Sequence, residues 1–354
     1  MMPKISILAG VFALLITGTA VRSQVQPPPA PWRGAGPTPC VGSDGGVMQC
    51  PPATRTTVIR AGRLFDSKAA RMLTKQVVVI QGERIAEVGA DGQVKIPAGA
   101  DVIDLSQATV LPGLIDAHTH MFNTPKAGMS REASVLIAAQ NAKADLMAGF
   151  TTARDMSSHG NGYADVDMRK AIDEGRVEGP RYQVAGRGIV WKGAANATPE
   201  NPLASIVVGT VEEARAAVRD HIEHSVDWIK LFPTGAYSFT STGAVQYVLT
   251  YPMPILQALI DETHRLGHKA ACHVLGGEGQ KNAIIAGCDT IEHAFGLDQE
   301  QANMIVQKNL YYDPTFQRYL EPYMDDNDNR DTGGKFRMIP IFEKAVTMAA
   351  ATRG

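Results

Sequence analysis

Residues 110–120 read VLPGLIDAHTH, an apolar run that ends in two histidines, His118 and His120. Residues two apart on a β-strand point to the same side, so the two imidazoles can face one metal ion. Because they follow the apolar run, they lie near the carboxyl end of the strand, where barrels of parallel strands carry their active sites. The pattern favours a metal site over a pair of histidines with structural hydrogen bonds.

Two further histidines occupy equivalent positions later in the chain. His273 ends the run 269–273, and His293 ends the run 289–293. A barrel gathers the carboxyl ends of its strands at one rim, so these side chains would meet His118 and His120 there. Four imidazoles suit a borderline-soft divalent ion such as Zn²⁺.

Lys230 lies inside the apolar strand-like run 226–232. A buried ammonium group is unfavourable without a partner, and it cannot bind a cation as it stands. Two interpretations follow: a structural lysine held by a salt bridge, or a lysine converted to an anionic carbamate that bridges two metal ions. The residues alone favour the first.

The chain from residue 112 to 354 alternates strand-like and helical patterns, which predicts an α/β fold with a parallel sheet. The helical patterns include 211–224 and 256–266, with apolar residues three and four apart. Seven strands favour a (β/α)8 TIM barrel, incomplete at about seven strands, over a doubly wound sheet. The predicted strands are 113–121, 150–156, 181–185, 226–232, 269–274, 290–295 and 310–316.

The N-terminal residues 1–23 have the pattern of a signal peptide: Lys4, the apolar run 5–16, then small residues at 17–20. The alternative is an uncleaved anchor, but a membrane span takes roughly 20 apolar residues. We therefore expect a periplasmic or secreted protein with no stable membrane span after signal cleavage.

Residues 24–53 are rich in Pro and Gly, which indicates a linker, and residues 54–111 form a small β module, half of a composite sandwich. Cys40 and Cys50 lie in the linker, and a disulfide between them and two free thiols are equally compatible with it. Cys272 and Cys288 lie in apolar runs and are predicted to be buried, inert thiols.

Composition excludes several classes of partner. The 354-residue chain has a formal net charge of −2, 6% aromatic residues and no Lys/Arg-rich run. Nucleic acid and anionic membranes are therefore poor candidates for a partner. The oligomeric state stays open, with a homo-oligomer as one option.

The motif at 110–120 resembles the signature of the amidohydrolase superfamily, and more narrowly its imidazolonepropionase-like and Xaa-Pro dipeptidase (prolidase-like) group. Residues 150–155, FTTARD, resemble the second barrel strand of that group. Residues 276–279 and 282–287 resemble the link between its fifth and sixth strands. The resemblance runs from about Thr56 to the end and is specific for the superfamily rather than for a substrate.

The resemblance implies a site with two zinc ions. His118 and His120 would hold one ion, His273 and His293 the other, and Lys230 would bridge them as a carbamate. A metal-activated hydroxide would then attack the carbonyl of an amide or peptide C–N bond, in a dipeptide (Xaa-Pro-like) or an N-acyl amino acid. The alternatives are a hydrolase of cyclic amides or lactones, and a non-catalytic metal- or ligand-binding remnant.

One expected residue is not found. The family places an aspartate at the end of the eighth barrel strand, whereas this chain follows its seventh predicted strand with a polar loop and a helical stretch at 336–351. The strands that would complete the small β module are not found either. We therefore assign no catalytic residue and expect a C-terminally truncated chain, a fragment with little or no activity.

Other candidate residues receive structural interpretations. His221 and His224 are expected to be solvated helix histidines. His159 is by default a loop histidine, with a place at the barrel mouth as the alternative. For Tyr237 a packing role and a substrate contact both stay open, and Arg187 and Tyr237 are weak candidates for binding a carboxylate. The acidic residues 325–331 are predicted to form a polar loop over the barrel mouth.

Overall fold

The computed structural model describes residues 40–41, 45–48, 55–122, 129–194, 202–315 and 335–353. All of them lie in the compact unit Cys40–Gly354. The predicted signal peptide and the acidic loop at 325–331 fall outside the described residues. Within these segments, no helix has the length and apolar character needed to cross a membrane.

A four-stranded sheet forms the N-terminal β module, in the order β5-β4-β3-β6. Its strands are β3 (Thr56–Asp66), β4 (Arg71–Gln81), β5 (Arg84–Ala90) and β6 (Asp101–Val110). Only β3 and β6 run parallel to each other. Val58, Val77, Val79 and Val94 fill its small core. That this sheet is half of a sandwich stays a prediction.

A short antiparallel pair precedes this sheet, formed by β1 (Cys40–Val41) and β2 (Val47–Met48). It lies within the segment that was expected to be a linker. Cys40 is disulfide-bonded, but Cys50 falls in a part of the chain that is not described. A Cys40–Cys50 disulfide therefore stays a prediction.

The VLPGLIDAHTH segment leads into β7 (Leu114–Thr119), which pairs in parallel with β8 (Phe150–Asp155). β8 in turn pairs with β9 (Arg181–Val184), so the order is β7-β8-β9. Gly113 precedes β7 where a Cβ atom would lie 1.9 Å from Oγ1 of Thr151, so only glycine fits without displacing that side chain.

The second sheet has six strands, all parallel, in the order β11-β10-β12-β15-β16-β17. Four of them match predicted strands: β12 (Trp228–Leu231), β15 (Lys269–Val274), β16 (Thr290–His293) and β17 (Tyr311–Asp313). β10 (Gly188–Trp191) and β11 (Ser205–Val208) were not anticipated.

The two sheets meet between β9 and the start of β12. The backbone N–H of Asp227, just before β12, donates to the carbonyl of Val184 at 2.9 Å, and the Asp227 carboxylate accepts from the Val184 N–H at 2.9 Å. The fold is therefore α/β with parallel sheets. Among the described strands β17 is not paired with β7, and a closed (β/α)8 barrel stays a prediction.

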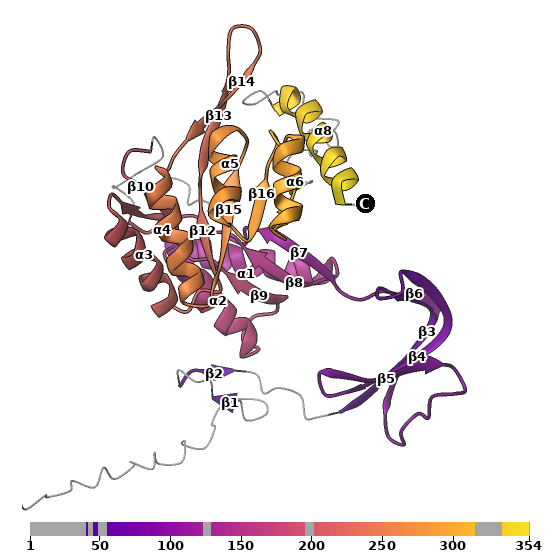
Figure 1. The fold of residues 1–354 in the computed structure, drawn as a ribbon. Helices are drawn as coiled ribbons and strands as arrows, with labels where there is room; N and C mark the ends of the chain where they lie inside the picture. The colour runs from indigo at the N-terminus through magenta and orange to yellow at the C-terminus, as the bar shows by residue number, and fades with distance from the viewer. Residues whose placement is uncertain are drawn as a thin grey trace, which may run out of the picture. The chain divides into compact units, whose positions relative to one another are not determined.

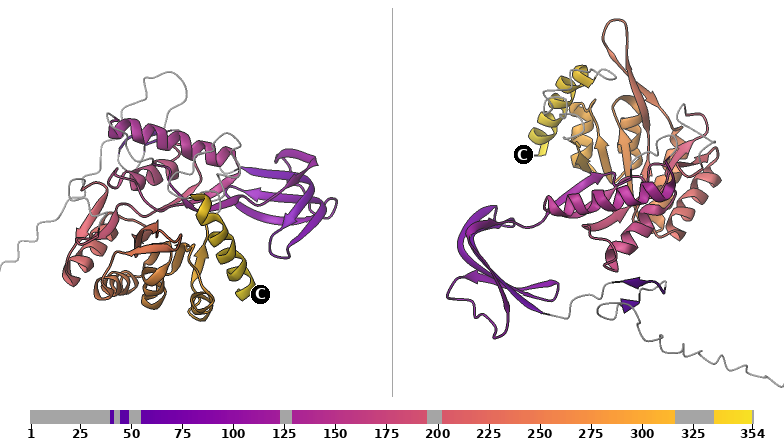
Figure 2. Two further views of the ribbon diagram at one scale, coloured as in Figure 1. Left: turned by 90° about the horizontal axis from the view of Figure 1, so that it is seen from above. Right: turned by 180° about the vertical axis from the view of Figure 1, so that it is seen from behind.

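Helices follow most of the parallel strands and cover one side of them. In Figure 1, α4, α5 and α6 lie along β12, β15 and β16, and the view from above in Figure 2 shows the orange helices on the outer side of these strands. The helices are α1 (Arg131–Met147), α2 (Ala164–Asp173), α3 (Val211–Glu223), α4 (Met253–Arg265), α5 (Gly277–Ala286), α6 (Gln299–Gln307) and α8 (Lys335–Arg353).

The main core lies between these helices and the sheet, where Ile229 and Ile291 on strands pack with Leu256, Leu259 and Ile284 on helices. Polar caps fix the helix starts. Thr210 and Glu213 form a capping box at the start of α3. The alternation of apolar strands and amphipathic helices in the sequence therefore correctly predicted that helices pack on this sheet.

A hairpin of β13 (Thr234–Phe239) and β14 (Val245–Leu249) follows β12 and extends past the carboxyl ends of the neighbouring strands (Figure 1). Tyr237 belongs to it, and its ring centroid lies 5.9 Å from that of Phe239. Both rings pack in an apolar cluster with Leu275 and Phe295. Tyr237 thus packs against apolar neighbours, which is one of the two roles that the sequence left open.

Two expectations need correction. Cys272 and Cys288 form a disulfide with 6.1 Å between their Cα atoms, so they are not inert thiols. The reason is local: the N–H of Asp289 donates to the carbonyl of Ala270 at 3.0 Å, which brings the segment before β16 against β15. His221 is buried rather than solvated, because α3 turns this residue toward the core.

Candidate active site

Four histidines meet at the carboxyl ends of the strands. His118 lies near the end of β7, and its ring centroid is 5.3 Å from that of His120 and 4.8 Å from that of His293. His273, in β15, lies 4.6 Å from His293. The structure therefore brings together all four of the histidines that the sequence singles out.

His293 reaches this cluster through an unusual backbone. Its φ is +70° and that of Ala294 is +46°, both in the left-handed region that residues other than glycine seldom adopt. In a regular strand Glu292 and His293 would point to opposite faces. The left-handed turn lets both side chains face the site, and strain of this kind is typical of functional positions.

Lys230 lies at the base of this cluster and is only 1% exposed. Its Nζ has no hydrogen-bond partner among the described residues, so the salt-bridged interpretation is not supported. Burial lowers the pKa of the amine to about 8. A buried amine with no hydrogen-bond partner is unfavourable in an unmodified lysine.

The protonation of the histidines fits a metal site. Burial lowers the pKa of His273 to about 3 and holds the pKa values of His118 and His293 well below their usual range. The nearby Lys230 amine adds to each of these shifts. The three imidazoles are therefore neutral at pH 7, and neutral imidazole is the form that binds metal ions.

Three of the rings are anchored through Nδ1. In His118 this nitrogen lies 2.5 Å from Oε2 of Glu292, in His120 3.4 Å from the carbonyl of Ser157, and in His293 2.7 Å from Oγ1 of Thr315. For His118 and His120 this leaves Nε2 as the nitrogen that can bind a metal ion. Metal-binding histidines are commonly oriented in this way.

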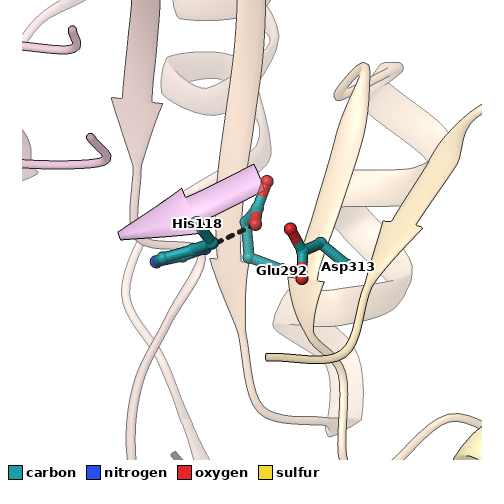
Figure 3. Close-up of side chains that lie close together, drawn as sticks. All are labelled: His118, Glu292 and Asp313. Atoms are coloured by element: carbon teal, nitrogen blue, oxygen red, sulfur yellow. Dashed lines mark hydrogen bonds and ion pairs between the residues drawn. The ribbon is translucent and has the colours of Figure 1, made fainter. Parts of the chain in front are cut away.

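Two carboxylates at the site were not anticipated. Figure 3 shows Glu292, from β16, and Asp313, from β17, beside His118; one ligand atom of each of the three lies within 4.8 Å of the others. Oδ2 of Asp313 has no hydrogen bond within the described chain, and the guanidinium of Arg154 is 3.6 Å away. From the sequence, a site carboxylate was expected only on an eighth strand. Asp313 was not singled out, because it ends a seventh strand of only three residues.

Asp155 and His159 line the side of the site next to His120. The buried carboxylate of Asp155 accepts hydrogen bonds from the Met121 N–H at 3.1 Å and from the Tyr182 hydroxyl, and its Oδ1 lies 3.7 Å from Nδ1 of His120. His159 stacks on His120 with 4.0 Å between centroids, and burial lowers its pKa to about 4. His159 therefore lies beside the histidine cluster, which agrees with the alternative of a place at the barrel mouth and not with the default of a simple loop histidine.

Arg187 is engaged elsewhere. Its guanidinium donates to the Asp220 carboxylate and to the Pro202 carbonyl, both at 2.8 Å, and stacks over the ring of Tyr163. A guanidinium that is neutralised by a carboxylate of α3 has little capacity left for a substrate carboxylate. Arg187 therefore drops out as a candidate for substrate recognition.

Comparison of the sequence with known proteins gives relatives with named activities. The chain is 26% identical over 297 residues to ochratoxinase of Aspergillus niger, covering 75% of this chain and 60% of the relative. The chain thus spans about 60% of the length of that curated relative. An uncharacterised protein of Mycobacterium bovis is 27% identical over 222 residues, 62% of this chain and 53% of the relative.

Solved structures show the same fold. A crystal structure of an Xaa-Pro dipeptidase with methionine bound in its active site matches with a TM-score of 0.71 and 28% identity, covering 84% of this chain and 77% of that one. The crystal structure of A. niger ochratoxinase matches in fold, with a TM-score of 0.68 and 22% identity over 85% of this chain and 74% of that one.

The family assignment rests on most of the chain and not on the histidine motif alone. The model of the amidohydrolase family, whose members generally bind divalent metals, matches residues 109–333. That range includes each of the histidines described above, together with Lys230, Glu292 and Asp313. The chain belongs to the amidohydrolase family.

Proposed function

We propose that this protein is a metal-dependent hydrolase that cleaves the amide or peptide C–N bond of a dipeptide (Xaa-Pro-like) or an N-acyl amino acid. The observation that carries the proposal is the buried Lys230 amine, which has no hydrogen-bond partner within the described residues and lies among neutral histidines. A metal site is the simplest arrangement that accounts for both features.

The residues divide between two ions. His118 and His120 would hold the first ion, and His273 and His293 the second. Lys230, as a free amine, would react with carbon dioxide to form an N–C bond with release of a proton, and the resulting carbamate would supply an anionic ligand to the metal site. Nitrogen ligands in this number favour zinc over harder cations such as Mg²⁺.

When bound, two such ions would make a water molecule more acidic and polarise the carbonyl of the substrate. The protein's own groups provide the positioning. Glu292 and the Ser157 carbonyl hold the rings of His118 and His120, and Thr315 holds that of His293. His159 stacks on His120 and limits the access of bulk water on that side.

The choice of substrate class follows from the relatives. One solved relative, 28% identical, is named as an Xaa-Pro dipeptidase, an enzyme of peptide bonds. Among the described residues, Arg154 and Arg187 are not free for a substrate carboxylate, because both are paired with carboxylates of the protein. The metal ions would then be the main attraction for a carbonyl or carboxylate oxygen.

The test uses the full chain, stripped of metal with a chelator and reconstituted with zinc. Hydrolysis of members of a panel of Xaa-Pro dipeptides and N-acyl amino acids, dependent on zinc and abolished by Lys230→Met, supports the proposal. Such turnover would also overturn the expectation, based on the missing eighth-strand aspartate, that the chain has little or no activity. His224→Ala, an exposed histidine of the same chain, is the matched control and leaves the rate unchanged. Hydrolysis that survives metal removal contradicts the proposal. Zinc binding with no turnover on the panel points to a binding protein instead.

We also propose a periplasmic or secreted location, based on the signal-like pattern of residues 1–23. The Cys272–Cys288 disulfide supports it, because disulfides persist in oxidising compartments. Mass measurement of the mature protein from its native host tests this. Loss of about the first 20 to 23 residues is expected, and an intact N-terminus contradicts it.

A further inference from the structure

Arg154 connects several strands beneath the histidine cluster. Its side chain, 10% exposed, extends from β8; Nε donates to the carbonyl of Ala117 at 2.5 Å, and Nη2 donates to Oε1 of Glu292 at 2.9 Å. Nη1 lies 3.3 Å from Oγ1 of Thr290. The guanidinium also packs 4.5 Å above the ring of Trp228. One side chain thus joins β7, β8, β12 and β16.

Glu292 completes the connection from Arg154 to the site. Its carboxylate is fully buried; Oε1 accepts from Arg154 and from the Thr290 hydroxyl, and Oε2 accepts from Nδ1 of His118. Both oxygens therefore have hydrogen-bond partners. A carboxylate with both oxygens hydrogen-bonded is poorly placed to bind a metal ion directly. This holds although His118, Glu292 and Asp313 lie close enough together to be potential ligands of one ion.

His118 is consequently held at two points by the same pair. The carbonyl of Ala117, the residue before it, is fixed by Arg154, and its ring is fixed by Glu292. An ionised carboxylate only accepts hydrogen bonds, so the neutral imidazole carries its proton on Nδ1 and has its lone pair on Nε2.

We propose that Arg154 and Glu292 are positioning residues that set the tautomer and orientation of His118, with Nε2 directed at the metal site. This inference rests on the proposed function only in naming a metal ion as the ligand of Nε2. The tautomer of His118 and the Arg154–Glu292–His118 hydrogen bonds do not depend on the proposed function. Partners of this kind influence metal affinity without contacting the ion.

The first test measures the tautomer of His118 in the metal-free full chain by ¹⁵N NMR, assigned with a His118→Gln spectrum. The wild type is expected to show the Nδ1-protonated form. Glu292→Gln, whose amide can also donate a hydrogen bond, is expected to show a mixture of the two tautomers. Glu262→Gln is the matched control, because this buried glutamate also pairs with arginines, Arg219 and Arg265, and contacts no histidine of the cluster. A wild-type ring protonated on Nε2 overturns the inference.

The second test measures zinc affinity by competition with a chromophoric chelator. Glu292→Gln and Arg154→Met are each expected to weaken one of two zinc sites by about 10- to 100-fold. Because part of the effect of Arg154 passes through Glu292, the loss of affinity in the double variant is expected to be smaller than the sum of the two single losses. Circular dichroism and thermal melting of each variant identify any that fails to fold, and Arg154→Lys then replaces Arg154→Met.

The outcomes separate this inference from the proposed function. A wild type that binds no zinc contradicts the proposed function, while the NMR test still decides on the positioning of His118. A wild type that binds zinc, with affinity and tautomer unchanged in both variants, overturns the positioning role. Complete loss of one zinc in Glu292→Gln with no effect of Arg154→Met identifies Glu292 as a direct ligand and also overturns it.

Discussion

The ring of His118 lies 4.8 Å from that of His293, although the two residues come from strands of different sheets. β7 belongs to the three-stranded sheet and β16 to the six-stranded one, so this contact crosses the space between them. The contact lies at the carboxyl ends of β7 and β16. It marks the position of the proposed active site.

Replacing Lys230 with methionine is expected to stabilise the metal-free protein by about 1–3 kcal/mol, because it removes a buried, unpaired amine and keeps the apolar stem. Denaturant unfolding of the chelator-treated chain measures this. Lys281→Met, which removes an exposed lysine paired with Glu300, is the control and should change stability by less than about 0.5 kcal/mol. A clear loss of stability in Lys230→Met would show that the amine has a partner that stabilises it.

The metal-free protein is expected to lose stability as the pH falls below about 6.5. The folded-state pKa values of His159 and His273 are lowered to about 4 and about 3, below the unfolded value, so the unfolded chain binds protons first. The contribution of these two neutral histidines to the free energy of unfolding is complete above pH 6.5. It decreases by roughly 1.4 kcal/mol per pH unit for each histidine, down to about pH 4 for His159 and about pH 3 for His273.

Unfolding curves at pH 7.5 and pH 5 measure this dependence. His273→Phe is expected to reduce the slope by about one proton, whereas His224→Ala, an exposed histidine of α3, should leave it unchanged. Equal stability of the metal-free wild type at the two pH values would mean that the imidazoles of the cluster are not held neutral by burial.

The Cys272–Cys288 disulfide closes a loop between residues 16 apart, and its removal is expected to lower stability by about 2–4 kcal/mol. The double variant Cys272→Ser, Cys288→Ser is compared with the wild type by denaturant unfolding without reductant, and the wild type with added reductant should approach the variant. If alkylation of the unfolded, unreduced wild type labels both cysteines, the disulfide is absent.

The strand-end histidines could be predicted because their signal is local. An i, i+2 pair after an apolar run places His118 and His120 on one face, and the recurrence of the pattern at His273 and His293 needs only parallel strands to bring the four together. For Lys230 the residues alone favoured a salt bridge, and its role at the metal site followed only from the resemblance to the family. Each of these positions is specified by the residues immediately before it.

The partners of these residues could not be predicted in the same way. Glu292 and His293 are adjacent, and only the left-handed φ of His293 lets both face the site, a conformation that no non-glycine sequence pattern indicates. Asp313 ends a strand of three residues, which is too short for a periodic signal. The Cys272–Cys288 disulfide depends on how the segment after α5 lies against β15, which is a tertiary property.

Anomalous diffraction at the zinc absorption edge, from crystals of the zinc-loaded full chain, tests the central claim most directly. The account predicts two peaks about 3.5–4 Å apart. One should lie about 2.0–2.1 Å from Nε2 of His118 and of His120, and the other at similar distances from His273 and His293, with density for a carbamate on Lys230 between them. Zinc peaks located away from these histidines, or an unmodified Lys230 amine beside an empty cluster, would contradict it.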